Sequence, residues 1–264
     1  MNVAYAASQS GAHGAEPNVG EVILHHVLDT NLIDIRLLGI NLSITKHVVM
    51  MWIASVLLVG IFFLAFRKRP IVPSGMSNLL EALIVFLRDE VIRPNMGEAG
   101  HRYVPYLLTV FFFILTCNLL GLIPFAATAT GNVSVTAALA IMSLVMIQVG
   151  GIKEHGFKHH IQNLVPHGIP VWLLPIMIPV EIMGQFTKPF ALCIRLFANM
   201  TAGHIVILSF LSMIFILKSL LVSPVAVFFA IFISLLEIFV AFLQAYIFTM
   251  LTSLFIGMSI HPQH

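Results

Sequence analysis

The residue with the most unusual setting for its chemistry is an arginine inside a long apolar run. Arg195 lies in the segment 190–200 among leucine, isoleucine and phenylalanine, too far from a polar boundary to reach one easily. Within a membrane such a charge costs from about 3 to more than 10 kcal/mol, so it persists only beside a partner or a water path. A fixed positive charge favours the ionised form of a nearby carboxyl group. Arg195 is therefore the main candidate functional residue.

Other polar residues recur at helical spacing around this arginine. Glu181, Lys188 and Arg195 are seven residues apart. On a helix they drift by only about 20° per step and form one stripe. Asn199 stays within about 40° of Arg195, whereas His204 lies on the opposite face and about 13 Å along the axis. Polar groups are thus predicted on two faces at different depths.

The last apolar run carries a second polar pair, Glu237 and Gln244, again seven residues apart. His204 can titrate near neutral pH, and burial can bring Glu237 there, so these two residues could relay protons. Asn199 and Gln244 could instead be interhelical hydrogen-bonding groups, which are common in membranes. Gln185, together with Lys188, is a minor candidate for the same path.

Other kinds of chemistry find little support in the sequence. It has no Ser-His-Asp arrangement, phosphate-binding glycine loop or cysteine-rich metal signature. His155 and His159 are four residues apart and could hold a metal. They lie beside Lys153 and Lys158 at the end of an apolar run, which is more typical of a solvated juxtamembrane segment. We expect no metal site and no cofactor.

The composition identifies the medium in which these residues act. Of the 264 residues, 59% are apolar and only 9% are charged, and the mean hydropathy is +1.01. A soluble globular domain carries about a quarter of its residues as charges, so most of this chain lies in lipid. A net charge of +2 is too small for a nucleic-acid binder. Cys117 and Cys193 lie in apolar runs, which predicts buried free thiols.

A bilayer core about 30 Å thick needs about 20 apolar residues per helix. The sequence predicts an all-α integral membrane protein whose membrane domain covers residues 46–264, after an extracytoplasmic segment 1–45 that lacks the features of a signal peptide. Ala4-Tyr5-Ala6 is similar to the end of a signal-peptidase site, which would fit a segment upstream. Five spans are expected, at about 47–66, 103–123, 133–152, 171–217 and 223–258.

Charge sets the expected orientation. Residues 67–102 hold six of the thirteen basic residues, whereas residues 124–132 hold no charge. The positive-inside rule places 67–102 in the cytoplasm, with the N-terminus outside and His264 in the cytoplasm. Within this loop, residues 76–92 are predicted to form an amphipathic surface helix. Its apolar positions are Leu79, Leu80, Leu83, Ile84 and Leu87.

The last two spans are too long to stand upright. As helices, 171–217 and 223–258 would measure about 70 Å and about 52 Å. We expect them to tilt strongly or to bend, with Pro175, Pro179 and Pro189 as sites for a bend. Such a hairpin exposes a broad flank that another membrane partner would cover.

The sequence resembles the subunit a family of F-type ATP synthases along most of its length. Arg195-Leu-Phe-Ala-Asn-Met200, followed by Ala202-Gly203, is similar to the signature of that family. Further segments that resemble the family are Asn118–Pro124, Pro166–Pro170 and Leu243–Phe248. Only about the first 40 residues show no resemblance.

The resemblance implies a membrane stator that holds two offset aqueous half-channels against a rotating ring of c subunits. Arg195 would draw the proton from each passing ring carboxylate and prevent leakage between the half-channels. Glu181, Asn199 and Gln244 match positions along the path. His204 and Glu237 match a pair whose two members are exchanged relative to some relatives. The loop 128–132 lacks an aspartate that many relatives carry, which puts its role in the inlet channel in question.

The same resemblance implies partners and a location. They are the c-ring, b-type peripheral-stalk subunits, the whole F1Fo complex and the lipid bilayer of a bacterial-type energy-transducing membrane. The chain itself would catalyse no reaction, because ATP chemistry would belong to partner subunits. The ion could be H⁺ or Na⁺, and His204 favours H⁺.

Two other functions remain open from the residues alone. In a self-contained secondary transporter, Arg195 would bind an anionic substrate, but such a protein would show inverted repeats, and none is found. In a structural scaffold, Arg195 would pair with Glu181 or Glu237 for packing only. A scaffold does not explain polar residues on two faces.

Overall fold

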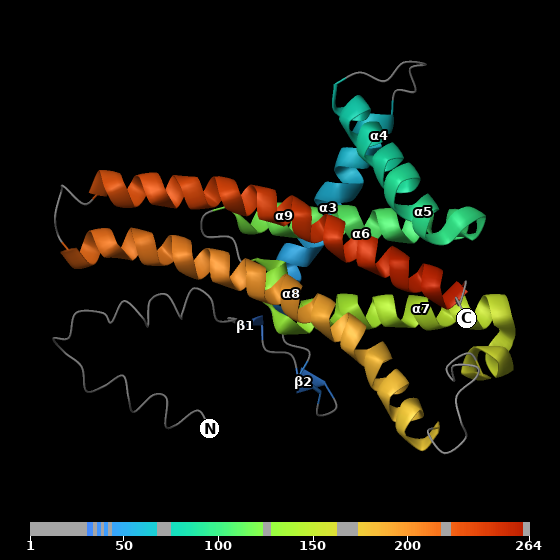
Figure 1. Ribbon diagram of the computed structural model, residues 1–264. Helices are drawn as coiled ribbons and strands as arrows, with labels where there is room; N and C mark the ends of the chain where they lie inside the picture. Colours follow the sequence, from blue (N-terminus) through green and yellow to red (C-terminus); the bar gives the residue numbers. More distant parts are fainter. Residues whose placement is uncertain are drawn as a thin grey trace.

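The computed structural model describes residues 31–33, 36–37, 40–41, 44–67, 75–123, 128–162, 174–217 and 223–260. This part of the chain is helical apart from four short strands near its start (Figure 1). The helices in order are α3 (Lys46–Phe66), α4 (Met76–Phe86), the π-helix η1 (Leu87–Ile92), α5 (Arg93–Met96), the 3-10 helix η2 (Gly97–Arg102), α6 (Val104–Gly121), the 3-10 helix η3 (Ala129–Gly131), α7 (Val133–Gln162), α8 (Leu174–Leu217) and α9 (Ser223–Ile260).

The strands form two small antiparallel pairs just before α3. β1 (Asn31–Ile33) pairs with β4 (Ile44–Thr45), and β2 (Arg36–Leu37) pairs with β3 (Ile40–Asn41). The resemblance of residues 4–6 to a signal-peptidase site lies outside the described residues.

Within the described residues, five helices are long and apolar enough to cross a membrane: α3, α6, the first part of α7, α8 and α9. Their mean hydropathies lie between 1.6 and 2.7. Apart from the short strands, the chain is thus the five-span helical membrane protein that the sequence predicts.

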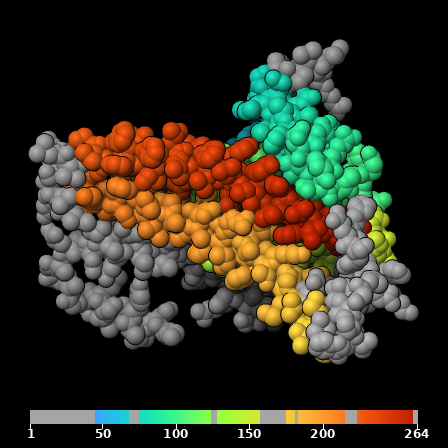
Figure 2. Space-filling view, viewed as in Figure 1, coloured from blue at the N-terminus to red at the C-terminus, as the bar shows by residue number. Residues whose placement is uncertain are grey.

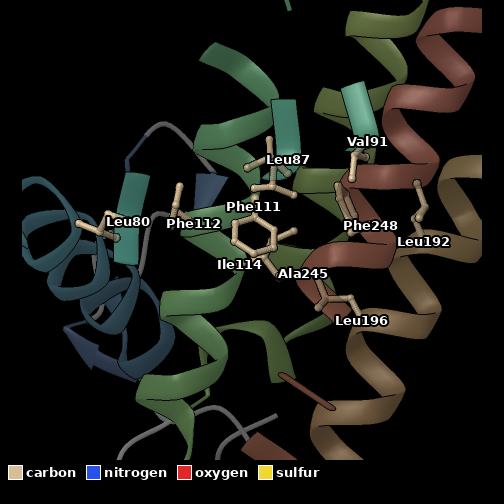
Figure 3. Close-up of a cluster of buried hydrophobic side chains, with 11 residues drawn as sticks. Leu80, Leu87, Val91, Phe111, Phe112, Ile114, Leu192, Leu196, Ala245 and Phe248 are labelled. Atoms are coloured by element: carbon tan, nitrogen blue, oxygen red, sulfur yellow. The ribbon is translucent and has the colours of Figure 1, made fainter. Parts of the chain in front are cut away.

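The core forms where helices from distant parts of the sequence meet. Figure 3 shows Phe111 and Ile114 of α6 beside Phe248 of α9, and Leu192 and Leu196 of α8 on the far side of α9. Leu80 of α4 and Leu87 and Val91 of η1 also belong to this cluster of buried side chains. The core fixes α8 and α9 against α6, and so it positions the polar residues of the last two helices.

The surface segment differs in detail from the predicted amphipathic helix. It is divided into α4, η1 and α5, because a π-helical turn interrupts it. Leu80 and Leu87 are buried and Leu83 and Ile84 partly buried, as their spacing predicts. Leu79 is 56% exposed, where it is free to contact lipid. It lies one residue, or about 100°, from Leu80, at the edge of the apolar stripe.

The two long helices run side by side across the whole molecule. At 44 and 38 residues, α8 and α9 would extend about 66 Å and about 57 Å if straight. Figure 1 shows that the yellow N-terminal part of α8 turns away from the line of its orange part. Pro179 and Pro189 lie inside α8, where each removes a backbone donor and so permits bending.

Figure 2 shows this hairpin as two adjacent ridges on one face of the molecule. Many of its large apolar side chains are exposed; among them are Phe186, Phe190, Phe228, Ile231, Leu235 and Phe239, at 62% to 66%. The flank is therefore suited to contact lipid or another membrane protein.

Candidate functional site

Two amide side chains join the long helices at the level of the arginine. The Asn199 Nδ2 group on α8 donates a hydrogen bond to Gln244 Oε1 on α9 over 2.8 Å. Gln244 is buried, whereas Asn199 is on the exposed side of its helix. The sequence predicts both residues as path-lining or interhelical groups, and the structure brings them into direct contact.

A carboxylate is buried where α9 passes α8. Glu237 is 3% exposed, and neither of its carboxylate oxygens has a hydrogen-bond partner in the described part of the chain. A Cβ atom placed on Gly203 would lie 2.5 Å from Glu237 Oε1, so the carboxylate lies directly against the glycine backbone. The carboxyl group of Glu237 is thus held between the two long helices, and a carboxyl group is chemically able to bind and release a proton.

His204 follows Gly203 but does not bond to Glu237 in this structure. Its Nε2 atom hydrogen-bonds the hydroxyl group of Thr128, the residue that precedes η3. The proton relay expected between His204 and Glu237 is therefore not a direct hydrogen bond. The loop 128–132, whose role was in question for want of an aspartate, supplies Thr128 as the hydrogen-bond partner of His204.

Arg195 lies on the exposed side of α8 between two buried leucines, Leu192 and Leu196. It makes no hydrogen bond or ion pair with a residue that the structure describes. The packing pair with Glu237 is not formed, because both oxygens of that acid are unpartnered. Its charge thus faces outward from the hairpin.

The remaining predicted residues lie along the first half of α8. The Lys188 Nζ atom is 5.1 Å from the centroid of the Phe255 ring, a cation–π contact with α9. Gln185 accepts a hydrogen bond from the Gln148 amide of α7. Glu181 belongs to α8, but its side chain lies outside the described residues. Lys188 and Gln185 therefore join α8 to its neighbours.

Sequence reasoning missed a second buried polar network beside Glu237. The Thr130 hydroxyl group donates to Asn118 Oδ1 over 2.6 Å, and the Asn118 amide donates to the Ala241 carbonyl oxygen over 3.4 Å. Thr130 and Asn118 are fully buried. A signal was present, because Asn118 begins a segment that resembles the family, but only the fold brings it to α9.

No group of three or more potential metal ligands occurs among the described residues. His155, considered above as a possible metal ligand, instead donates from Nε2 to the Ile260 carbonyl oxygen over 2.7 Å and so fixes the end of α9 to α7. Cys117 and Cys193 are buried and free, as predicted.

The arrangement combines an outward-facing positive charge with internal groups that can hold a proton. Along α8, Asn199 lies about 6 Å and His204 about 13.5 Å from Arg195 by helical rise. Glu237 comes from α9 and Thr128 from the loop before η3, so three separate elements contribute. Such a set can exchange protons on one side and ion-pair with an external carboxylate on the other.

Comparison with known proteins agrees with this arrangement. Residues 48–257 match the family described as ATP synthase A chain. The chain is 50% identical to ATP synthase subunit a 2 of Prosthecochloris aestuarii, over 97% of this chain and 84% of that protein. It is 54% identical to ATP synthase subunit a of Myxococcus xanthus, over 85% of this chain and 75% of that protein. The chain therefore belongs to the ATP synthase A chain family.

Proposed function

We propose that this chain is the proton-translocating stator subunit of an ATP synthase. It would deliver protons to, and remove them from, carboxylates on a rotating ring of c subunits through two aqueous half-channels. Proton flow would thereby be coupled to rotation and ATP synthesis. Membership of the family favours this function over a self-contained secondary transporter.

The observation that carries the proposal is the outward position of Arg195. An exposed arginine in the middle of an apolar helix, without a partner among the described residues, needs an external anion to offset its desolvation in lipid. A ring carboxylate that passes the flank supplies such an anion. Arg195 would favour loss of the proton from that ring carboxylate. Its fixed positive charge would also oppose the direct flow of protons from one half-channel to the other.

Glu237, His204, Asn199 and Gln244 would line the path inside the chain. Glu237 and His204 can each gain and lose a proton, whereas the two amides can only orient water or a passing carboxylate. Glu181 would lie farther along α8 on the same path. Lys188 and Gln185 contribute packing contacts, which support a minor role.

The chain would be non-catalytic, because ATP chemistry would reside in other subunits of the complex. The exposed flank of α8 and α9 would face the c-ring, and the segment α4 to η2 would face the b-type peripheral stalk in the cytoplasm. That orientation follows from the basic residues of 67–102. The N-terminus would then lie outside, in a bacterial-type energy-transducing membrane.

The test is ATP-driven proton pumping in inverted membrane vesicles that carry the complex with Arg195→Ala. We expect an assembled complex that hydrolyses ATP but does not pump. Arg67→Ala, at the exposed end of α3, is the matched control and should pump normally. If Arg195→Ala pumps at a near-normal rate, the arginine is structural and the proposal is wrong.

A further inference from the structure

One threonine connects two histidines that are far apart in the sequence. Thr128 is buried, and its hydroxyl group hydrogen-bonds His204 Nε2 on α8. Its carbonyl oxygen accepts a hydrogen bond from His47 Nδ1 on α3 over 3.0 Å. His47 is itself only 7% exposed. Residues from α3, the loop before η3 and α8 thus form one continuous contact, His47–Thr128–His204.

Thr128 is also fixed from two further directions. Its carbonyl oxygen accepts a second hydrogen bond from the backbone N–H of Gly131 over 2.9 Å, which forms the turn of η3. A Cβ atom on Gly121, at the end of α6, would lie 2.6 Å from both Oγ1 and Cγ2 of Thr128. Only a glycine at position 121 leaves room for the Thr128 side chain. That side chain is therefore packed against the end of α6 as well as bonded to His204.

The hydroxyl group of Thr128 suits a histidine that changes its charge. A threonine hydroxyl can donate to the lone pair of a neutral imidazole nitrogen and can accept from the N–H of an imidazolium. By turning, it bonds His204 in both states and keeps its own proton throughout. An apolar side chain would bond neither state, and a carboxylate would favour the charged one.

His47 has a different role, because it contacts the Thr128 carbonyl oxygen, which can only accept hydrogen bonds. The Nδ1 atom of His47 must carry a hydrogen in this contact, and no proton can pass through the carbonyl oxygen to His204. Through this contact His47 therefore acts on the position of Thr128.

Few other charges surround this group. Glu237, against Gly203, is the single charged residue of α9, and α6, η3 and residues 133–151 of α7 contain no acid, base or histidine. On α3 the ionisable residues are Lys46 and His47, and on α8 the nearest in sequence is Arg195. Thr128 is thus the direct partner of His204, and Glu237 is the neighbouring acid.

We propose that Thr128 holds His204 in both of its protonation states and that His47 and Gly121 position Thr128 for this task. The inference rests on the proposed function, because it assigns positioning residues to the His204 part of the proton path.

The first test replaces Thr128 in the complete complex and follows ATP-driven pumping in inverted vesicles from about pH 6 to about pH 9. Thr128→Val should slow pumping about fivefold, the value of one hydrogen bond. Thr128→Ser keeps the hydroxyl group and should restore both the rate and the pH profile. Thr128→Asp should stabilise the imidazolium and move the alkaline limb of the profile to higher pH. Thr109→Val, on an exposed face of α6, is the matched control and should leave both unchanged.

The second test addresses the positioning residues. His47→Leu should reproduce the slow rate of Thr128→Val, whereas His47→Gln keeps an N–H donor and should recover most of it. Gly121→Ala should also slow pumping, because its Cβ atom displaces Thr128, and Gly60→Ala, with open space around it, should not. Added to Thr128→Val, His47→Leu should slow pumping no further.

The outcomes separate this inference from the proposed function. If Arg195→Ala abolishes pumping while assembled Thr128→Val complexes keep the normal rate and pH profile, the positioning inference is wrong and the function stands. If Ser and Val at position 128 give equal defects, the hydroxyl group is irrelevant and the inference is again overturned. If Arg195→Ala pumps normally, the proposed function fails first.

Discussion

Gly203 and Glu237 are in direct contact between α8 and α9, with 2.5 Å between a Cβ position on the glycine and Oε1 of the acid. The buried carboxylate occupies the space that any other residue at position 203 would need. This contact places a titratable group beside the polar face of α8, and no residue that the structure describes donates a hydrogen bond to it.

We predict that Gly203→Ala displaces Glu237 and slows proton pumping about tenfold or more, since catalytic geometry is sensitive to shifts of about 1 Å. Pumping in vesicles measures the effect. The shorter acid in Gly203→Ala/Glu237→Asp should recover part of the rate, because its carboxylate retreats from the new methyl group. Gly184→Ala is the control on the same helix, where no atom lies within 4 Å. An unaffected Gly203→Ala variant would show that the contact is unimportant.

The hydrogen bond between Asn199 and Gln244 should behave as a coupled pair. Replacing either residue by leucine leaves the other amide without its partner, at a cost of about 1 kcal/mol. The double variant should cost less than the sum of the single variants, because no amide is then left unpaired. Thermal unfolding of the purified complex measures this cycle. Strict additivity would mean that the 2.8 Å contact contributes nothing.

Gly257 packs against backbone, which cannot move aside as a side chain can. A Cβ atom there would overlap the carbonyl group of Asn95 in α5. We expect Gly257→Ala to destabilise the packing of α5 on α9 by about 1–3 kcal/mol. The amount of this protein that is recovered in the assembled complex should fall. It should remain normal for Gly60→Ala, because Gly60 has open space around it on α3. Normal assembly of Gly257→Ala would contradict the close packing.

Asp89, which lies outside the membrane spans, leads to a prediction about how stability depends on pH. Hydrogen bonds from the Arg88 guanidinium, at 2.9 and 3.0 Å, hold the pKa of the Asp89 carboxyl group below its ordinary value of 3.8. A carboxyl group whose pKa is lower in the folded state stabilises the fold at pH values above its unfolded-state pKa. This stabilisation is lost as the pH falls through the folded-state pKa.

Asp89→Asn should therefore lower the unfolding temperature slightly at neutral pH, and the difference should begin to shrink as the pH falls below about 3.8. Glu90→Gln, on the next residue and without an ion pair in the described part of the chain, is the control. If the difference in unfolding temperature between Asp89→Asn and the unchanged chain grew in acid, the prediction would be wrong. Unfolding of the purified complex between about pH 3 and pH 7 measures it.

The sequence alone determined the class of the protein and most of its elements. Long apolar runs separated by charged loops have one stable solution in lipid, which is a set of spanning helices, so five spans could be predicted. Arg195 could be found for the same reason, because a charge in an apolar run is costly and therefore informative. Local spacing also placed Asn199 and Gln244 on two adjacent helices, but it did not show that the two amides contact each other.

Only the tertiary structure decided which of these residues meet. The partner of His204 is Thr128, 76 residues away, and the surface against Glu237 is Gly203. Neither residue type reveals these contacts in the sequence, since a threonine in a loop and a glycine in a helix are ordinary. Their importance arises from close packing between α8, α9 and the loop before η3, where tenths of an ångström decide whether a contact forms. Helical periodicity gives the face on which a residue lies, but the register between distant helices is set by how their side chains interlock.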